Sequence, residues 1–187
     1  AIHHCRERMA FGKRLAEHAL MKNVLADLAI ESEAATALAL RLAHAIDASE
    51  QGDVQQTVMR RVLTPIAKFW ICKRGAAFAQ EAMECLGGNG YVEAEGQGVM
   101  ARIYREMPLN SIWEGAGNIM ALDLLRALRS ADVAAALAQE LAPARGAHAA
   151  FDRLVATLPE RLDGLATEAG ARLLARDVAL LVQAALL

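Results

Sequence analysis

The longest unbroken helical pattern in the chain covers residues 15–49, and it restricts the fold more than any other feature. Apolar residues recur there at three- and four-residue spacings, close to a heptad, and neither Gly nor Pro interrupts them. A helix of that length presents a long apolar stripe, which must pack against other helices to be removed from water. The segment therefore predicts a helical bundle.

A second long helix should follow, capped by Asp53 and reaching about Leu86. Gly52 and Asp53 form a turn signal, and Asp is a favoured N-cap residue. Pro65 lies inside the apolar pattern and should bend this helix or mark a break in it. Shorter helical segments are expected over residues 1–12, 97–105, 118–129, 132–142, 148–157 and 160–186, with Pro159 separating the last two.

Composition agrees with an all-α chain. The 187 residues are 55% hydrophobic but only 4% aromatic, which favours helices and predicts almost no strand. The formal net charge is −2, so the chain as a whole lacks the positive charge that binding to nucleic-acid phosphates requires. A nucleic-acid role would need a local basic patch. No apolar run approaches the roughly 20 residues that span a bilayer. Three irregularly spaced cysteines, Cys5, Cys72 and Cys85, argue for a reducing compartment, and we expect a soluble, cytoplasmic protein.

Neither end of the chain resembles a natural terminus. The chain opens at Ala1 without a starter Met and closes on an apolar run from Val182 to Leu187. We therefore expect a fragment of a longer polypeptide.

Glu114 is the polar residue with the most distinctive surroundings. Its carboxylate stands between Trp113 and Gly115, beside a large apolar ring and on backbone that can approach a ligand closely. Such a place suits a general base. The glycines up to Gly117 precede a helix whose first N–H groups would favour an anion such as a phosphate. The alternative is a plain glycine turn, with Asn118 as an N-cap and the carboxylate in solvent.

Two other segments could approach a ligand. Gly87, Gly88 and Gly90 are more glycines than the end of a helix needs, which indicates that another backbone or a ligand comes close. Arg8 lies three residues before Phe11. Its side chain either holds a phosphate or is a surface charge that stabilises the C-terminal end of the first helix.

No metal site is expected. His3, His4 and Cys5 are consecutive and point in different directions on a helix. Glu31 and Glu33 lack the Glu-x-x-His motif of di-metal bundles.

The motifs occur in the order and spacing of one family, and over residues 1 to about 130 the chain resembles the C-terminal helical domain of the acyl-CoA dehydrogenases. The matching pieces are RMAFGK at 8–13, LAD at 25–27, AK at 67–68, LGGNGY at 86–91, YR at 104–105 and IWEG at 112–115. Each piece is short, but the set is specific. The resemblance implies an up-down four-helix bundle with extra C-terminal helices, in two domains at residues 1–130 and 131–187.

The resemblance also implies a cofactor, FAD, and a reaction, the α,β-dehydrogenation of an acyl-CoA with hydride transfer to the flavin. Glu114 matches the catalytic base of the family, and Arg8 matches the arginine that contacts the FAD pyrophosphate across a subunit interface. The residues implied to contact FAD are Arg8, Phe11, Glu84, Gly87, Gly88, Trp113, Gly115, Ala116, Gly117 and Asn118. Glu84 and Asn118 depart from the family, which often has Gln at both positions.

Within the family, residues 104–128 are most similar to the AidB branch, flavoproteins of the bacterial adaptive response to DNA alkylation. Further C-terminal helices of that branch are implicated in DNA binding. In the corresponding extension of this chain, acidic residues outnumber arginines, which argues against DNA as its partner. The resemblance further implies a homodimer or homotetramer without a membrane partner. Acyl-CoA would be held by N-terminal domains outside this sequence, so we expect this chain alone to be inactive.

The sequence leaves three candidate functions for this protein. The first is the FAD-binding domain of a dehydrogenase, with Glu114 as base. The second is a DNA-protecting flavoprotein with little or no dehydrogenase activity. The third is a purely structural bundle, and the motif set argues against it.

Overall fold

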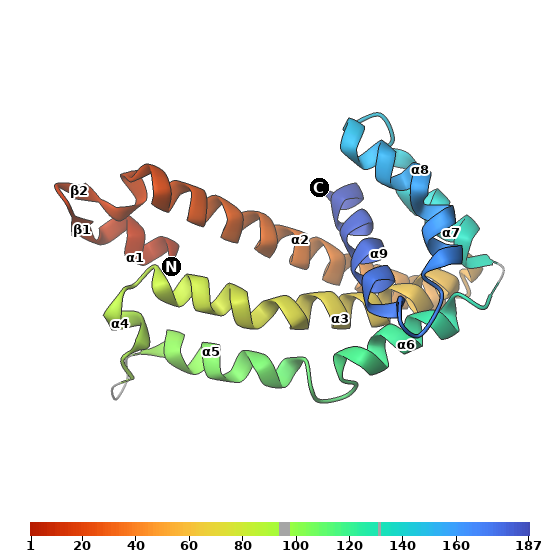
Figure 1. Ribbon diagram of the computed structural model, residues 1–187, viewed down its shortest axis with the longest axis horizontal. Coiled ribbons are helices and arrows are strands. Elements are labelled where there is room, and N and C mark those ends of the chain that lie inside the picture. Colours follow the sequence, from red (N-terminus) through yellow and green to blue (C-terminus); the bar gives the residue numbers. More distant parts are fainter. Residues whose placement is uncertain (94–97, 131) are drawn as a thin grey trace. The chain divides into compact units, whose positions relative to one another are not determined.

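The computed structural model describes residues 1–93, 98–130 and 132–187, and within them nearly all regular structure is helical (Figure 1). The all-α prediction is confirmed. The elements are α1 (Ile2–Glu7), β1 (Met9–Ala10), β2 (Lys13–Arg14), the 3-10 turn η1 (Leu15–Glu17), α2 (Ala19–Glu50), α3 (Val54–Glu84), α4 (Gly88–Tyr91), α5 (Val99–Asn110), α6 (Gly117–Ala127), α7 (Asp132–Leu141), the 3-10 turn η2 (Ala142–Ala144), α8 (Ala149–Gly164) and α9 (Ala171–Leu186).

The chain divides into two compact units, each with its own core. The first unit contains residues 1–33 and 72–110, and the second contains residues 34–71 and 111–187. The two long helices, α2 and α3, contribute residues to both units.

The core of the first unit joins α1 to the end of α3. Cys5, Leu28, Ala82 and Cys85 are buried in one cluster. The thiol of Cys5 lies 4.0 Å from the carbonyl oxygen of Cys85, which is within range of a weak S–H donor. Burial, followed by the neighbouring Cys5, raises the pKa of Cys85 from 9.0 to about 11. Both cysteines are free thiols that act as small core residues.

The first 14 residues differ from the expected single helix ending at Gly12. The helix α1 already ends at Glu7, and a two-stranded hairpin follows with Met9 opposite Arg14. Phe11 and Gly12 form its turn with φ angles of 50° and 83°. Positive φ at both central residues gives the turn a twist that matches paired strands, so a local hairpin replaces the last helical turns.

The two long helices form as predicted, with small shifts. Asp53 caps α3, because its Oδ1 accepts a hydrogen bond from the backbone N–H of Gln56 at 2.9 Å. Pro65 does not end α3, which continues to Glu84. Proline removes one backbone hydrogen bond, but its neighbours Leu63 and Ile66 are fully buried, and this packing holds the helix together.

The second unit buries the faces of α6, α7, α8 and α9 in one hydrophobic core with parts of α2 and α3. The largest residues without exposed surface include Leu38, Leu63, Leu124, Leu137 and Leu174. The helix α9 packs against α6, α7 and α8 (Figure 1). The C-terminal helices therefore share the core of the bundle segments.

The predicted break at Pro159 is wrong. The helix α8 passes through Pro159 to Gly164, and the chain turns only before Ala171. A Cβ at Gly170 would lie 2.6 Å from the carbonyl oxygen of Leu165, so that glycine permits the close turn. Leu158, beside Pro159, is buried in the core, and this packing outweighs the backbone hydrogen bond that Pro159 cannot make.

The remaining helices lie close to their predicted positions. The expected helix at 97–105 is α5, which extends to Asn110 through Pro108; Gln97 lies outside the described residues. The segment expected at 118–129 is α6. Among the described residues, no helix combines the length and the apolar character of a membrane span.

Candidate functional site

Glu114 lies in a tight turn between α5 and α6 with an uncommon backbone conformation. Its φ is 52°, and that of Gly115 is 114°. Among the described non-glycine residues, positive φ occurs at Phe11 and Glu114 alone, and both were predicted site residues. Such conformations cost about 1–3 kcal/mol and occur at functional sites, and at Phe11 the conformation also belongs to the hairpin turn.

Gly115 allows this turn to lie against α6. A Cβ built on Gly115 would approach the terminal methyl carbon of Met120 to 2.4 Å. Met120 packs against the core of the second unit. The left-handed backbone therefore disfavours a side chain at Gly115, whereas the flexible end of Met120 can shift to make room for a Cβ.

The start of α6 has unoccupied backbone donors. Ala116 is the N-cap residue and provides no side-chain cap, and its carbonyl oxygen accepts from the N–H of Met120 at 3.0 Å. The N–H groups of Gly117, Asn118 and Ile119 precede that first helical bond, so they lack acceptors within the helix. Asn118 is the second residue of α6 and not its N-cap. The alternative prediction, a plain glycine turn that ends with Asn118 as N-cap, is wrong on this point.

A residue that the sequence did not single out joins this segment. Nη1 of Arg172, at the start of α9, donates a hydrogen bond to Oδ1 of Asn118 at 2.8 Å. Its guanidinium also lies 5.7 Å from the centre of the Phe69 ring. Arg172 and Asn118 are 54 positions apart in the sequence, which therefore offered no local signal of this contact.

Glu114 and Trp113 are exposed on the surface of the second unit, and 53% of Trp113 is accessible. Six of the predicted site residues, Trp113 to Asn118, thus form one continuous segment of that unit. Its chemistry is a carboxylate followed by a helix start that suits an anion.

The other predicted contacts belong to the first unit. Arg8 is exposed at the end of α1, and its N–H donates to the carbonyl oxygen of His4 at 2.8 Å. Phe11 is 94% exposed at the hairpin tip, where its ring meets that of His18 edge to face at 6.2 Å. The contact of Cys5 with Cys85 brings α1 against the end of α3, which leads directly into the glycine loop.

The glycines of that loop have different roles. A Cβ on Gly90 would lie 2.2 Å from the carbonyl oxygen of Met83, so Gly90 serves internal packing. Gly87 and Gly88 have open space where a Cβ would be, and Gly87 has a φ of 60°. Glu84 is exposed and accepts a hydrogen bond from Gln80 at 3.2 Å. The two open glycines are the part of the loop that another molecule could approach.

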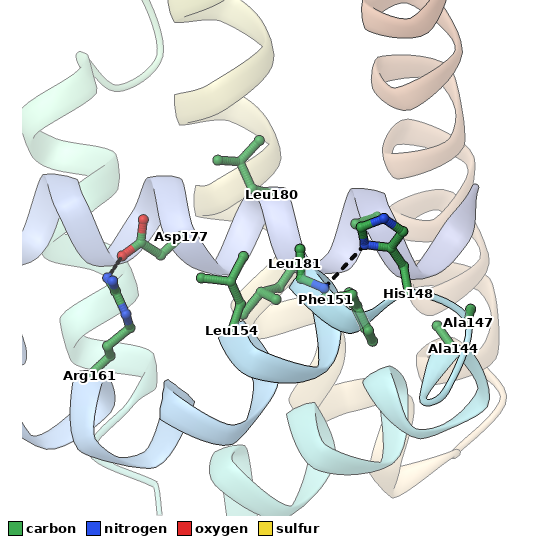
Figure 2. Close-up of a pocket in the computed structure, with 11 residues that line it drawn as sticks. Ala144, Ala147, His148, Phe151, Leu154, Arg161, Asp177, Leu180 and Leu181 are labelled. Atoms are coloured by element: carbon green, nitrogen blue, oxygen red, sulfur yellow. Dashed lines mark hydrogen bonds and ion pairs between the residues drawn. The ribbon is translucent and has the colours of Figure 1, made fainter.

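A cavity of about 430 Å³ lies between α8 and α9 and contains none of the predicted residues. Figure 2 shows Leu154, Leu181 and Phe151 along its middle. The ion pair of Arg161 and Asp177 lies at one end and His148 at the other (Figure 2). This cavity is separate from the Glu114 segment.

Comparisons with known proteins agree with this fold. Residues 1–129 match the acyl-CoA dehydrogenase C-terminal domain. The chain is 46% identical to AidB of Escherichia coli K12 over 171 residues, which are 91% of this chain and 31% of that protein. It is 33% identical to the glutaryl-CoA dehydrogenase of Desulfococcus multivorans over 129 residues, 67% of this chain and 31% of that enzyme. The chain thus spans about a third of the length of these relatives.

A solved structure has the same fold. The crystal structure of Caenorhabditis elegans ACDH-11 in complex with C11-CoA matches with a TM-score of 0.83 at 23% identity. The match covers 98% of this chain and 34% of the other. Because the family match covers residues 1–129, more than half of the chain, this protein belongs to the acyl-CoA dehydrogenase family through its C-terminal helical domain.

Proposed function

We propose that this chain is the FAD-binding, base-bearing domain of an acyl-CoA dehydrogenase-like flavoprotein, with Glu114 as the base. In this reaction the carboxylate takes the α-proton of the acyl thioester, and the flavin accepts a hydride from the β-carbon. The observation that carries the proposal is the left-handed backbone of Glu114, directly before a helix start with free N–H groups.

The residues present fit the diphosphate of FAD. Gly117, Asn118 and Ile119 offer N–H groups at the positive end of α6, and the first turn of that helix contains no acidic residue. Arg172 adds a guanidinium beside Asn118. In this proposal the segment binds the diphosphate and so orients the flavin relative to Glu114.

Glu114 would have to be shielded from water to act on a C–H bond. Its side chain is exposed on this chain, so the shielding would come from the acyl chain of the substrate and from the rest of the enzyme. We propose that acyl-CoA is the substrate and that it enters against this surface.

A second copy of the protein would complete the cofactor site. Phe11 has 94% of its surface exposed, and Arg8, Gly87 and Gly88 are exposed too. Aromatic residues and arginines are enriched at interfaces between proteins. These residues would reach the cofactor of a neighbouring subunit, which requires a homodimer or a homotetramer.

The test is Glu114→Gln in the longest natural polypeptide that contains this chain. We expect acyl-CoA turnover to fall by a factor of about 100 or more, because the proton acceptor is removed, while bound FAD stays unchanged. Glu168→Gln, another exposed glutamate of the second unit, serves as the control and should retain full turnover. Unchanged turnover in the Glu114 variant would rule out its role as base.

A second candidate function is DNA binding by an AidB-like flavoprotein. The observation in its favour is that the similarity to AidB covers 91% of this chain and so extends well into the C-terminal helices. Removal of α7, α8 and α9 would disturb the core of the second unit, so substitution of surface charges is the better test. The double variant Arg145→Glu and Arg153→Glu changes only exposed charges. DNA binding predicts salt-dependent retention on duplex DNA that this variant loses, and salt-insensitive retention contradicts it.

A further inference from the structure

The helix α9 places a fixed positive charge at the start of α6. Arg172 is the second residue of α9, and its Nη1 donates to Oδ1 of Asn118 at 2.8 Å. The same guanidinium lies over the ring of Phe69, 5.7 Å from its centre, which is a cation–π distance. These two contacts hold an otherwise exposed side chain in one orientation.

This position is electrostatically unusual. The N-terminal end of a helix carries a partial positive charge, so a cation there is disfavoured and an anion favoured. Arg172 hydrogen bonds there to a neutral amide, and the first turn of α6 has no acidic residue. A guanidinium and free backbone N–H groups thus meet at one point, and an anion is the ligand that suits both.

The contact also sets the orientation of the Asn118 side chain. A guanidinium has donors only, so the amide oxygen of Asn118 must face Arg172. The NH2 group of the same amide is then left as a donor for another group. An amide held in this way would add a side-chain donor to the N–H groups of the α6 start.

We propose that Arg172 is a positioning residue, which orients the Asn118 amide and the start of α6 for the diphosphate of FAD. This inference rests on the proposed function. Residue 172 lies outside residues 1–129, which match the family domain. The C-terminal extension thus takes part in the cofactor site.

The test is a double-mutant cycle with Arg172→Gln, Asn118→Ala and the combined variant, in the longest natural polypeptide that contains this chain. FAD affinity is measured by titration of the cofactor-free protein. Each single variant should weaken FAD binding about tenfold, and the combined variant should bind no more weakly than the weaker single. Arg172→Lys keeps the charge and should restore part of the affinity.

A readout without cofactor separates orientation from charge. In the ¹⁵N NMR spectrum of this 187-residue chain, the side-chain amide signals of Asn118 should shift in Arg172→Gln. The matched control is Arg176→Gln, one turn along α9, where the arginine hydrogen bonds to Asp177 instead. It removes the same charge from the same helix and should change neither the Asn118 signals nor FAD affinity.

The outcomes distinguish the inference from the proposed function. If the unmodified protein binds FAD and Arg172→Gln binds it equally well, Arg172 has no positioning role, while the proposed function stands. If the effects of the two single variants add in full, Arg172 does not act through Asn118, and the inference is wrong. If the unmodified protein binds no FAD, both proposals fall.

Discussion

Arg41 and Glu140 are 99 positions apart in sequence, yet they form a two-pronged ion pair. Nε and Nη2 of Arg41 each donate to a different carboxylate oxygen of Glu140 at 2.7 Å. The two side chains are only 12% and 11% exposed. The pair links α2 to α7 within the second unit, and the third nitrogen of the guanidinium, Nη1, is buried without a hydrogen-bond partner.

Glu140→Leu should therefore destabilise the protein strongly. It leaves a guanidinium in a mostly buried place without its counter-ion, and we expect a loss of about 3 kcal/mol in the free energy of unfolding. Urea denaturation measures this change. The double variant Arg41→Met, Glu140→Leu removes both charges and should recover most of the loss, because similar apolar side chains fill the same space.

The matched control for that prediction is Asp123→Leu. Asp123 also accepts two hydrogen bonds from an arginine, Arg61, but that arginine is 54% exposed. Water can solvate the arginine that remains, so the loss should be below about 1 kcal/mol. Equal effects of the two substitutions would show that burial of the Arg41–Glu140 pair has no energetic consequence.

Gly115→Ala should destabilise the second unit by more than a comparable change elsewhere. The alanine would have to adopt a φ of 114°, far from the left-handed region near 57° that alanine can reach, whereas the flexible end of Met120 can move away from the new Cβ. Gly146→Ala is the control, because Gly146 has a φ of 84° but open space around a Cβ. We expect about 1 kcal/mol for the control, from backbone strain alone, and roughly twice that for Gly115→Ala in thermal or urea unfolding. Equal losses would show that the larger φ of Gly115 adds no strain beyond that at Gly146.

Alkaline pH should weaken the first unit through Cys85. The folded state raises the pKa of Cys85 from 9.0 to about 11, mainly by burial, so between these values the unfolded chain loses this proton and the folded chain keeps it. The contribution is fully present below pH 9 and is lost as the pH rises towards 11, by up to about 2–3 kcal/mol.

Unfolding free energies measured in urea at pH 8, 9.5 and 10.5 check this prediction. Cys85→Ala should be less stable at pH 8 and should show a shallower decline with pH than the unmodified protein. Cys72→Ala, at a partly exposed cysteine, should keep the original decline. A pH dependence that is identical in all three proteins would contradict the assignment.

Phe11→Gly should affect binding and not folding. The ring is 94% exposed, so little apolar burial is lost, and glycine relieves the strain of a φ of 50°. Glycine also gives the unfolded chain more freedom, so the net change in unfolding free energy should stay within about 1 kcal/mol. FAD affinity or subunit association should fall clearly.

The control is Leu20→Ala, at an apolar residue that is 81% exposed, which should leave both FAD affinity and subunit association unchanged. A large loss of stability in Phe11→Gly would contradict the prediction.

Local patterns were enough to predict most helices and the Glu114 turn. The apolar spacing of α2 and α3 depends only on residues within one or two turns, and the Asp53 cap involves a residue three positions away. The glycines around Glu114 likewise indicated unusual backbone, which the positive φ angles bear out. The family domain could be recognised from the order of its short motifs for the same reason, because each motif is local.

Where the errors arose, distant packing or turn geometry outweighed local preference. Pro159 lies inside a continuous helix, because the packing of that helix outweighs one missing hydrogen bond. The hairpin at Phe11 forms where a helix seemed to continue.

Apolar periodicity and glycine placement along the chain thus determined which segments are helical and where a base could stand. The tertiary structure alone determined that Arg41 forms an ion pair with Glu140 and that Arg172 donates a hydrogen bond to Asn118. Each arginine pairs with a residue of another helix, 99 and 54 positions away in the sequence, so sequence spacing cannot select the partner. The selection follows from helix packing, which brings one particular guanidinium within 3 Å of its acceptor.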